Sequence, residues 1–404
     1  MTAMANEFGF NEKEKDQNLG ANIAMGFFIV GGVASAATGY LADTKHRVHL
    51  FAATVICGEC ACLATYFSRT YPELLASRIC GGIGVGGAAP VVFSIFADLY
   101  PNTARTQMAT LIGISMSAGI TLGQLLAGLV GPTYGWRLPF LIIATPAILN
   151  ALAVLVLANE PERGSQEHAV IVANEVGRYQ QDTHRSNSPK DAHSSMSPSV
   201  CKLTSQAVRD AQADTRTRYV ESISWCKVRA LLHTHTVALC YLQGVPGCMP
   251  WGMVYVFLND YLSHDLGLGV HAATACMAVF GVGSVGGQLL GGWLGQRIYN
   301  TGRHSEQCLF MGAACMAGAI PVIFILEHGP ASGHTGWIAY LGLMFVGGLA
   351  VSIPGPNVRA VLQNVCLPET RGTAFALFNL TDDIGKGGGP ALVALLVHGL
   401  GGRR

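Results

Sequence analysis

The sequence predicts an all-α membrane protein with two similar helical halves, and three observations carry this prediction. Half of the 404 residues are hydrophobic and only 12% are charged, whereas soluble domains carry about 25% charged residues. Ten apolar segments are each long enough to cross a bilayer, which takes about 20 residues. A single hydrophilic stretch separates these segments into two sets of five.

The ten predicted spans have short connections everywhere except at that stretch. Their long, uncharged runs exclude strands and the helices of a soluble core. The 50 glycines fit a bundle in which neighbouring helices approach closely. The spans are 19–41, 48–67, 72–97, 106–130, 139–157, 235–258, 270–294, 307–326, 336–353 and 373–400.

The hydrophilic stretch, residues 158–230, is rich in Ser, Asn, Gln, His and charged residues, which predicts a mostly flexible linker. Its last part could form a helix that lies along the membrane surface. The chain therefore divides into four parts. These are an N-terminal loop (1–18), an N-terminal helical half (19–157), the linker (158–230) and a C-terminal helical half (231–404).

Lysine and arginine gather in the loops on one face of the predicted bundle. That face holds Lys45, Arg47, Arg105 and Arg371 together with the linker. Because cytoplasmic loops carry the excess of basic residues, this face is predicted to be cytoplasmic and residues 1–18 to be non-cytoplasmic. Such a multi-pass protein fits either the plasma membrane or an endolysosomal membrane. The net charge of +1 gives no reason to expect a nucleic acid partner.

The two halves repeat each other at equivalent places. The sequence GYLAD (39–43) closes the first span and GWLGQR (292–297) closes the seventh. PNTAR (101–105) follows the third span and PETR (368–371) follows the ninth. Two similar halves joined by a long loop are typical of secondary transporters, which rock one half against the other.

Three motifs resemble those of the major facilitator superfamily. GYLADTKHR (39–47) is similar to the loop signature between the second and third helices of that family, with Thr44 in place of the usual first Arg. Leu74-x-x-x-Arg78, followed by glycines, resembles the fourth-helix motif, and WRLPF (136–140) resembles the entry to the sixth helix. The stretch 39–164 is most similar to the Spinster-like branch, although Gly87 stands where that branch usually has an acidic residue.

The resemblance implies a major facilitator fold in which about ten helices match family helices 2 to 11, so that counterparts of helices 1 and 12 are absent. It also implies that the 39–47 loop docks on the other half when the cytoplasmic side is closed. We expect Asp43 to face the N-terminus of the last helix near Thr373, and Arg47 to pair with Asp98. Ordinary interfacial charge is the alternative explanation. The predicted gating residues are Gly39, Asp43, Arg47, Asp98, Arg105 and Arg371.

The last predicted span contains three charged residues, Asp382, Asp383 and Lys386. Asp382 and Lys386 are four positions apart and are expected to pair on one face. Asp383 then lacks a partner and could carry a proton. The run GKGGGP around Lys386 is expected to loosen or break the helix. A purely structural ion pair is the alternative.

Other polar residues within spans are candidates for a substrate or ion pathway. Arg78 is expected to contact an anionic substrate or a coupling carboxylate, with snorkelling to the interface as the alternative. Glu59 could titrate or could hold a neighbouring helix. Prolines are expected to interrupt the sixth span near Pro246 and the ninth near Pro354. The full set of predicted pathway residues is Arg78, Glu59, Gln243, Asn259, Asn357, Asp382, Asp383 and Lys386.

We therefore expect transport of a small organic or amphipathic solute by alternating access, with a lysolipid, a sphingoid lipid or an organic anion as options and with proton coupling as an option. The alternative is a non-transporting regulatory or vestigial membrane protein. No enzyme activity is expected, because no catalytic set of residues is present. No metal or cofactor is expected, since Cys57, Cys60 and Cys62 lack a second Cys pair or a nearby His.

Overall fold

The computed structural model describes residues 1–100, 104–161, 229, 232–302, 304–331, 333–366 and 370–399, and all regular elements within them are helices. The N-terminal half contains α1 (Thr2–Phe8), α2 (Glu12–Glu14), the π-helical η1 (Lys15–Asn22), α3 (Ile23–Thr44), α4 (Arg47–Phe67), α5 (Tyr71–Leu99), α6 (Arg105–Tyr134) and α7 (Leu138–Leu157). The C-terminal half contains α11 (His235–Met253), the π-helical η3 (Val254–Leu258) and η4 (Tyr261–Asp265), α12 (Gly269–Asn300), α13 (His304–Glu327), α14 (His334–Ser352), α15 (Pro354–Val365) and α16 (Arg371–Gly399).

Eight helices within the described residues are long and apolar enough to cross a membrane. Two further long helices, α11 and α16, complete the ten that the sequence predicts. Both are less uniformly apolar, since α11 contains Pro246 and Pro250 and α16 contains Asp382, Asp383 and Lys386. Their partners within the bundle, rather than lipid alone, must therefore accommodate their polar groups.

Three local expectations are wrong. Residues 1–18 are not simply a loop, because α1 lies there and the first long helix begins at Glu12 rather than at 19. The helix α16 runs unbroken through GKGGGP, and α11 runs unbroken through its two prolines. The irregular part follows α11 instead, as η3 and η4. Near Pro354 the helix is disturbed but does not stop: α14 ends at Ser352 and α15 begins at Pro354, while Ile353 between them keeps helical dihedral angles (φ −55°, ψ −42°).

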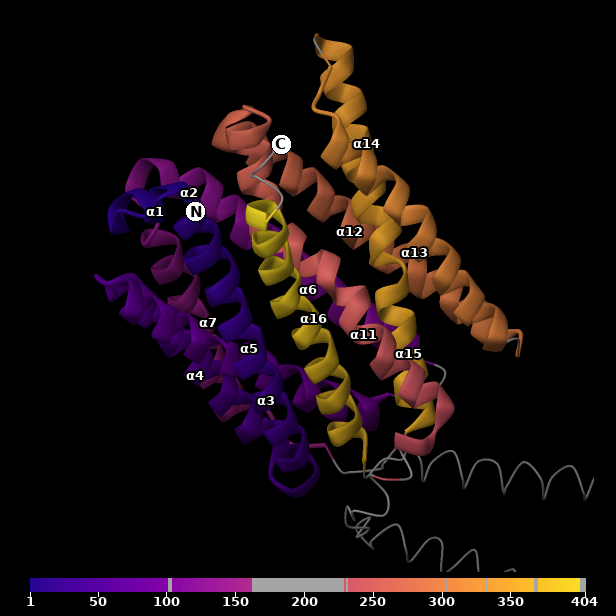
Figure 1. Cartoon of the computed structure of the whole chain (residues 1–404). Coiled ribbons are helices and arrows are strands. Elements are labelled where there is room, and N and C mark those ends of the chain that lie inside the picture. The colour runs from indigo at the N-terminus through magenta and orange to yellow at the C-terminus, as the bar shows by residue number, and fades with distance from the viewer. Residues whose placement is uncertain are drawn as a thin grey trace, which may run out of the picture.

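The two halves pack against each other mainly through two helix pairs. In Figure 1, α3 and α16 lie side by side along their lengths, and α6 packs on α12 in the same manner. Glycines allow these close approaches. A methyl group added at Gly39 of α3 would lie 2.6 Å from the carbonyl oxygen of Gly372 in α16, so only glycine fits there.

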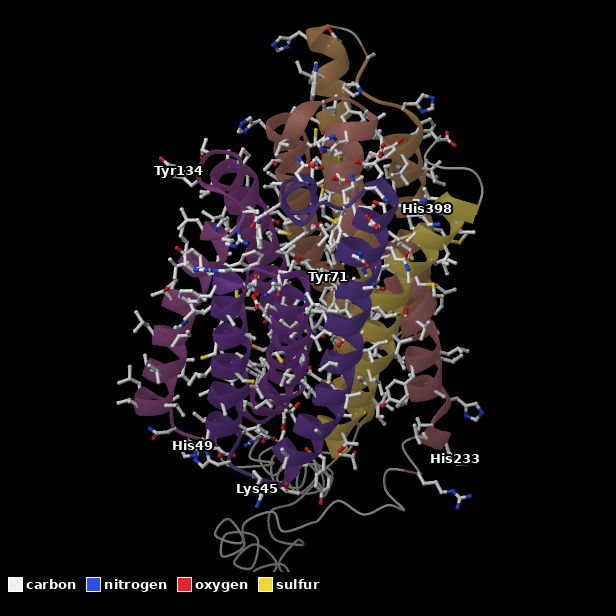
Figure 2. The ribbon with its side chains drawn as sticks, turned by 60° about the vertical axis from the view of Figure 1, so that its left-hand side comes forward. Lys45, His49, Tyr71, Tyr134, His233 and His398 are labelled. Carbon is white, nitrogen blue, oxygen red and sulfur yellow. The ribbon has the colours of Figure 1, made fainter. Side chains whose placement is uncertain are left out.

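The bundle has two distinguishable ends. Lys45, His49 and His233 lie at one end, where the linker leaves the bundle, and His398 lies towards the other (Figure 2). We call these the linker end and the far end. The linker, including its predicted surface helix, lies almost wholly outside the described residues.

Candidate functional site

At the linker end, Asp43 joins the two halves as predicted. The residue sits in the last turn of α3, and its carboxylate accepts hydrogen bonds from the first turn of α16. Gly372 N donates to Oδ1 at 3.2 Å, while Thr373 N and Thr373 Oγ1 donate to Oδ2 at 3.1 and 2.9 Å. A helix N-terminus has unsatisfied N–H groups and a partial positive charge, so a carboxylate is a favourable partner there.

Arg47 makes the second predicted contact, and it does so within the N-terminal half. Its side chain is buried, and Nη1 lies 2.5 Å from Asp98 Oδ2 at the end of α5. Glu160, just beyond α7, adds bonds of 3.0 Å to both Nε and the backbone N of Arg47. Glu160 is not among the residues predicted from the sequence, because a glutamate at the start of a hydrophilic linker has the pattern of ordinary surface.

The remaining predicted gating residues fall at the same end. Gly39 forms the close crossing of α3 and α16 described above. Arg371 is 3% exposed at the start of α16, beside the residues that bind Asp43. Arg105 begins α6, and its side chain lies outside the described part of the chain.

An apolar cluster lies between this linker-end contact and the middle of the bundle. Phe93 of α5 stacks on Phe375 of α16, with ring centroids 4.5 Å apart. Tyr241 of α11 packs into the same cluster and donates a hydrogen bond to the carbonyl oxygen of Ala374 at 3.1 Å. Arg359 of α15 holds its guanidinium 5.9 Å from the Phe93 ring centroid. Rings from both halves thus seal the linker end.

The charged group of α16 lies at mid-height, about 17–22 Å along the helix from Arg371 at 1.5 Å per residue. The expected pairing is wrong here. Lys386 Nζ binds Asp383 Oδ1 at 3.1 Å, across three positions rather than four. Both spacings place side chains on one face of a helix, so sequence alone could not choose between them. The choice falls to the neighbours, since Lys386 also lies 5.9 Å from the Phe28 ring of α3.

Among the described residues, Asp382 rather than Asp383 is the aspartate of α16 that makes no direct ion pair. It is 6% exposed, and Oδ1 has no hydrogen-bond partner within the described residues. It faces α11, where Gly244 leaves room for it and the Cys248 thiol lies beside it. Lys386 and Arg359 are the cations whose charges act on Asp382. We call Asp382, Asp383, Lys386 and Arg359 the charged centre.

Arg78 and Glu59 form a separate group inside the N-terminal half. Arg78 of α5 stacks over Phe140 of α7, 4.8 Å from the ring centroid, and interacts with Glu59 and Cys62 of α4. Arg78 Nε and Glu59 Oε2 are buried without a hydrogen bond among the described residues. The structure thus brings these two predicted pathway residues together, at the junction of α4, α5 and α7.

The other three predicted pathway residues lie apart from the charged centre. Gln243 is exposed on α11, and Asn259 lies between η3 and η4 at the far end. Asn357 is fully buried; its Nδ2 donates to the carbonyl oxygen of Gly291 at 2.9 Å and its Oδ1 accepts from Gln307 at 3.0 Å. Asn357 therefore holds α12, α13 and α15 together.

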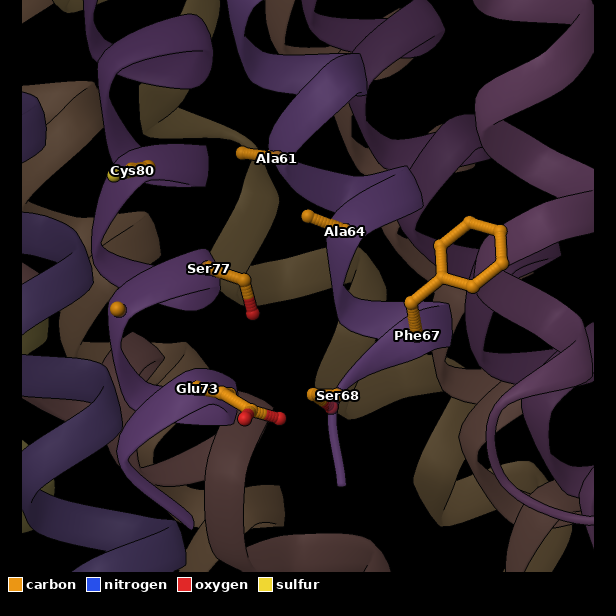
Figure 3. Close-up of a pocket in the computed structure, with 8 residues that line it drawn as sticks. Ala61, Ala64, Phe67, Ser68, Glu73, Ser77 and Cys80 are labelled. Carbon is orange, nitrogen blue, oxygen red and sulfur yellow. The ribbon is translucent and has the colours of Figure 1, made fainter. Parts of the chain in front are cut away.

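An open groove of about 520 Å³ lies between α4 and α5 towards the far end (Figure 3). Small residues such as Ala61, Ala64 and Ala76 form most of its lining. The Glu73 carboxylate at its rim accepts hydrogen bonds from the backbone amides of Arg69 and Thr70 at 2.7 and 3.2 Å. This carboxylate caps α5 and leaves the groove mostly apolar.

A family model described as Major Facilitator Superfamily matches residues 1–390. A niacin transporter of Acinetobacter baylyi is 31% identical over 30% of this chain and 28% of its own length. A benzoate transport protein of the same organism is 24% identical over 65% of this chain and 50% of its own length. The matched segments thus span half or less of each of these curated relatives.

Two solved structures share the fold. The human organic anion transporter MFSD10 superposes with a TM-score of 0.61 at 19% identity, covering 97% of this chain and 82% of that one. A bacterial homologue of the human lysosomal transporter Spinster, in an inward-facing and occupied conformation, gives a TM-score of 0.58 at 16% identity, covering 98% and 77%. At these identities the likeness concerns the fold alone.

Proposed function

Because the chain belongs to the major facilitator superfamily and is an integral multi-pass membrane protein, we propose that it transports small organic solutes by alternating access. The two halves rock about the α3–α16 and α6–α12 contacts, and the solute binds between them. The observation that carries this proposal is the charged centre. A charge in the middle of a bilayer costs about 3 kcal/mol or more unless it has a function or a partner, and this region holds four.

The linker face is, in this proposal, cytoplasmic, as the loop lysines and arginines predict. Residues 19–157 and 231–404 are then the two rocking halves, with the linker joining them on the cytoplasmic side. The contact of Asp43 with Thr373 acts as the cytoplasmic gate. The Arg47–Asp98–Glu160 network keeps the Asp43 loop in place within its own half.

An organic carboxylate is the solute class that the charged centre suits best. Lys386 and Arg359 supply two cations, and both can donate charge-assisted hydrogen bonds to a carboxylate. The Phe28 ring close to Lys386 offers a flat apolar surface for an aromatic ring. The relatives named for niacin and benzoate support this class, since both compounds are aromatic carboxylates.

We propose Asp382 rather than Asp383 for proton coupling, because Asp383 binds Lys386 whereas Asp382 has an oxygen without a hydrogen bond among the described residues. The charged or titratable neighbours of the Asp382 carboxylate are Cys248 on α11, Arg359 on α15, and Asp383 and Lys386 on its own helix. Lys386 is already bound to Asp383, so Asp382 has the smaller share of that charge. A buried carboxylate with an unbonded oxygen can take up a proton and pass it on.

Uptake of radiolabelled benzoate by the purified protein in proteoliposomes tests the proposal. The double variant Lys386→Met/Asp383→Asn removes the cation without stranding its partner, and we expect uptake to fall by about 10- to 100-fold, the value of one charge-assisted hydrogen bond. Arg297→Met, which removes an exposed cation at the linker end of α12, is the matched control and should transport like the wild type.

The outcomes separate the alternatives. Saturable benzoate uptake that depends on Lys386 supports the proposal. Uptake of a lysolipid in the same vesicles, with none of benzoate, would replace the carboxylate class by the lipid class of the Spinster-like branch. Benzoate binding without any uptake would favour a non-transporting protein.

A further inference from the structure

A buried ion pair joins the two halves at the far end. Lys15, at the start of η1, is 1% exposed, and Asp260, between η3 and η4, is 5% exposed. Lys15 Nζ lies 3.2 Å from Asp260 Oδ2. The same ammonium group also binds Glu12 Oε2 at 2.6 Å, but Glu12 belongs to the same half and its side chain is 77% exposed. The pair with Asp260 is therefore the buried link between the halves.

Other contacts at this end also cross from one half to the other. The Phe257 ring of η3 packs directly on the backbone of Gly20 in η1. Asp16 Oδ2 lies 3.6 Å from His398 Nε2 near the end of α16. Thr2 of α1 lies within hydrogen-bond distance of Asp260 Oδ1, at 3.4 Å, and of His264 Nε2, at 2.7 Å. All these residues sit in or beside π-helical turns or helix ends, where the backbone is less regular than in the spans.

From this geometry we infer that Lys15 and Asp260 form the far-end gate, the counterpart of the Asp43 contact at the linker end. This inference rests on the proposed function, since a gate requires alternating access. When the far end is closed, each charge is buried and has the other as its partner. When the far end opens, the halves separate, and both charges gain water in exchange for the lost pair.

The energetic consequence is specific to the closed state. Removing one member of a buried ion pair takes compensation away from the other charge, which is unfavourable. Lys15 would still have Glu12, and Asp260 would still have Thr2 and the nearby Met1 amino group, so the penalty is the loss of the pair that crosses between the halves. Removing both members leaves neither charge in the closed far end. Since the open state exposes either charge to water, a single neutralisation penalises only the closed far end and shifts the protein towards far-end opening. A double neutralisation should restore much of the closed population.

Amide hydrogen exchange of the whole purified protein, read by mass spectrometry, tests this inference without any solute. In Lys15→Gln and in Asp260→Asn, we expect exchange in residues 15–22 and 254–265 to become about ten-fold faster or more. Exchange around Gly39 and Thr373 should slow, because opening one end tightens the other. The double variant Lys15→Gln/Asp260→Asn should return both ends towards wild-type rates. Glu12→Gln is the matched control and should change neither end, because its exposed carboxylate contributes little.

Opposite changes at the two ends, with reversal in the double variant, support the gate. Unchanged exchange, or faster exchange at both ends alike, would overturn it and leave the pair as a general stabiliser. If neither single variant can be purified, the double variant decides: recovery of a folded protein with near-wild-type exchange supports the gate, and failure to fold contradicts it. Because no solute is involved, failure of benzoate uptake would leave this result standing, and a failed gate would leave the uptake result standing.

Discussion

The two halves meet through different chemistry at the two ends of the bundle. At the linker end, the Asp43 carboxylate accepts hydrogen bonds from backbone N–H groups at the start of α16. At the far end, the Lys15 ammonium meets the Asp260 carboxylate in a buried ion pair. The backbone N–H groups at a helix N-terminus cannot be removed by substituting a side chain, and water binds them when the Asp43 carboxylate moves away. The ion pair has two removable charges, so a single substitution of Lys15 or Asp260 should shift the balance between open and closed states more than a substitution of Asp43 does.

Substitution of Arg47 should give the largest loss of stability, because Arg47 binds Asp98 and Glu160 at the linker end of the N-terminal half. Arg47→Met leaves Asp98, which is 6% exposed, and Glu160 without the guanidinium that both contact. We expect a loss of about 3–5 kcal/mol in stability, measured by denaturant or thermal unfolding of the purified protein. Arg297→Met should lose under about 0.5 kcal/mol, as a surface substitution does. An equal loss in both variants would contradict the structural role of the network.

Substitution of Asp43 should slow transport moderately and leave solute binding almost unchanged. Asp43→Ala removes acceptors for Gly372 N and for both donors of Thr373, a capping arrangement of about 0.5–2 kcal/mol. We expect slower benzoate uptake with an almost unchanged dissociation constant, since the residue lies far from the charged centre. Thr373→Val removes one of the three bonds and should fall between the wild type and Asp43→Ala. An equal fall in binding and in turnover would argue against a gating role.

Substitution of Glu7 should give the smallest loss of stability. The contact of Glu7 with Arg137 holds α1 against its own half, near the Lys15–Asp260 pair. Hydrogen bonds from Arg137 lower the pKa of Glu7 below its ordinary value. A lowered pKa means that the stabilisation is present above the unfolded pKa and is lost as the pH falls through the folded pKa. The side chain is 41% exposed, so we expect under about 1 kcal/mol.

Tryptophan fluorescence between pH 6 and pH 3 can follow this contact, because Trp136 Nε1 also donates to Glu7 at 2.8 Å. Glu7→Gln should lack the acid transition that the wild type shows. The same transition in both proteins would assign it to another group.

The sequence predicts the linker end better than the far end. Asp43 and Arg47 lie in one short loop signature, so their contacts follow from the fold that the signature implies. Lys15 and Asp260 are far apart in the sequence and lie outside any motif. Lys15 also falls in a segment that looks like a polar loop, and only tertiary packing shows that it is buried.

The charged centre shows a second limit of sequence reasoning. Helical periodicity brings Asp382 and Asp383 equally within reach of Lys386, and the neighbours on α3 and α11 decide between them. Neighbouring residues also explain why α11 and α16 are unbroken. Gly385 and Gly389 of α16 pack closely on α11, and this contact keeps both helices regular despite their prolines and glycines. Composition and hydropathy, by contrast, suffice for the class of fold and for the order of the long helices, eight of which are apolar enough to span a membrane within the described residues.

In the proposed mechanism, solute binding at the charged centre is coupled to proton uptake by Asp382. The most direct test compares benzoate uptake into proteoliposomes at several external pH values for the wild type, Asp382→Asn and Asp383→Asn. We predict that Asp382→Asn retains exchange of internal for external benzoate but loses the dependence of net uptake on external pH. Asp383→Asn should be slower, because Lys386 loses its partner, yet should keep that dependence. Loss of the pH dependence in Asp383→Asn, with its retention in Asp382→Asn, would contradict proton coupling through Asp382.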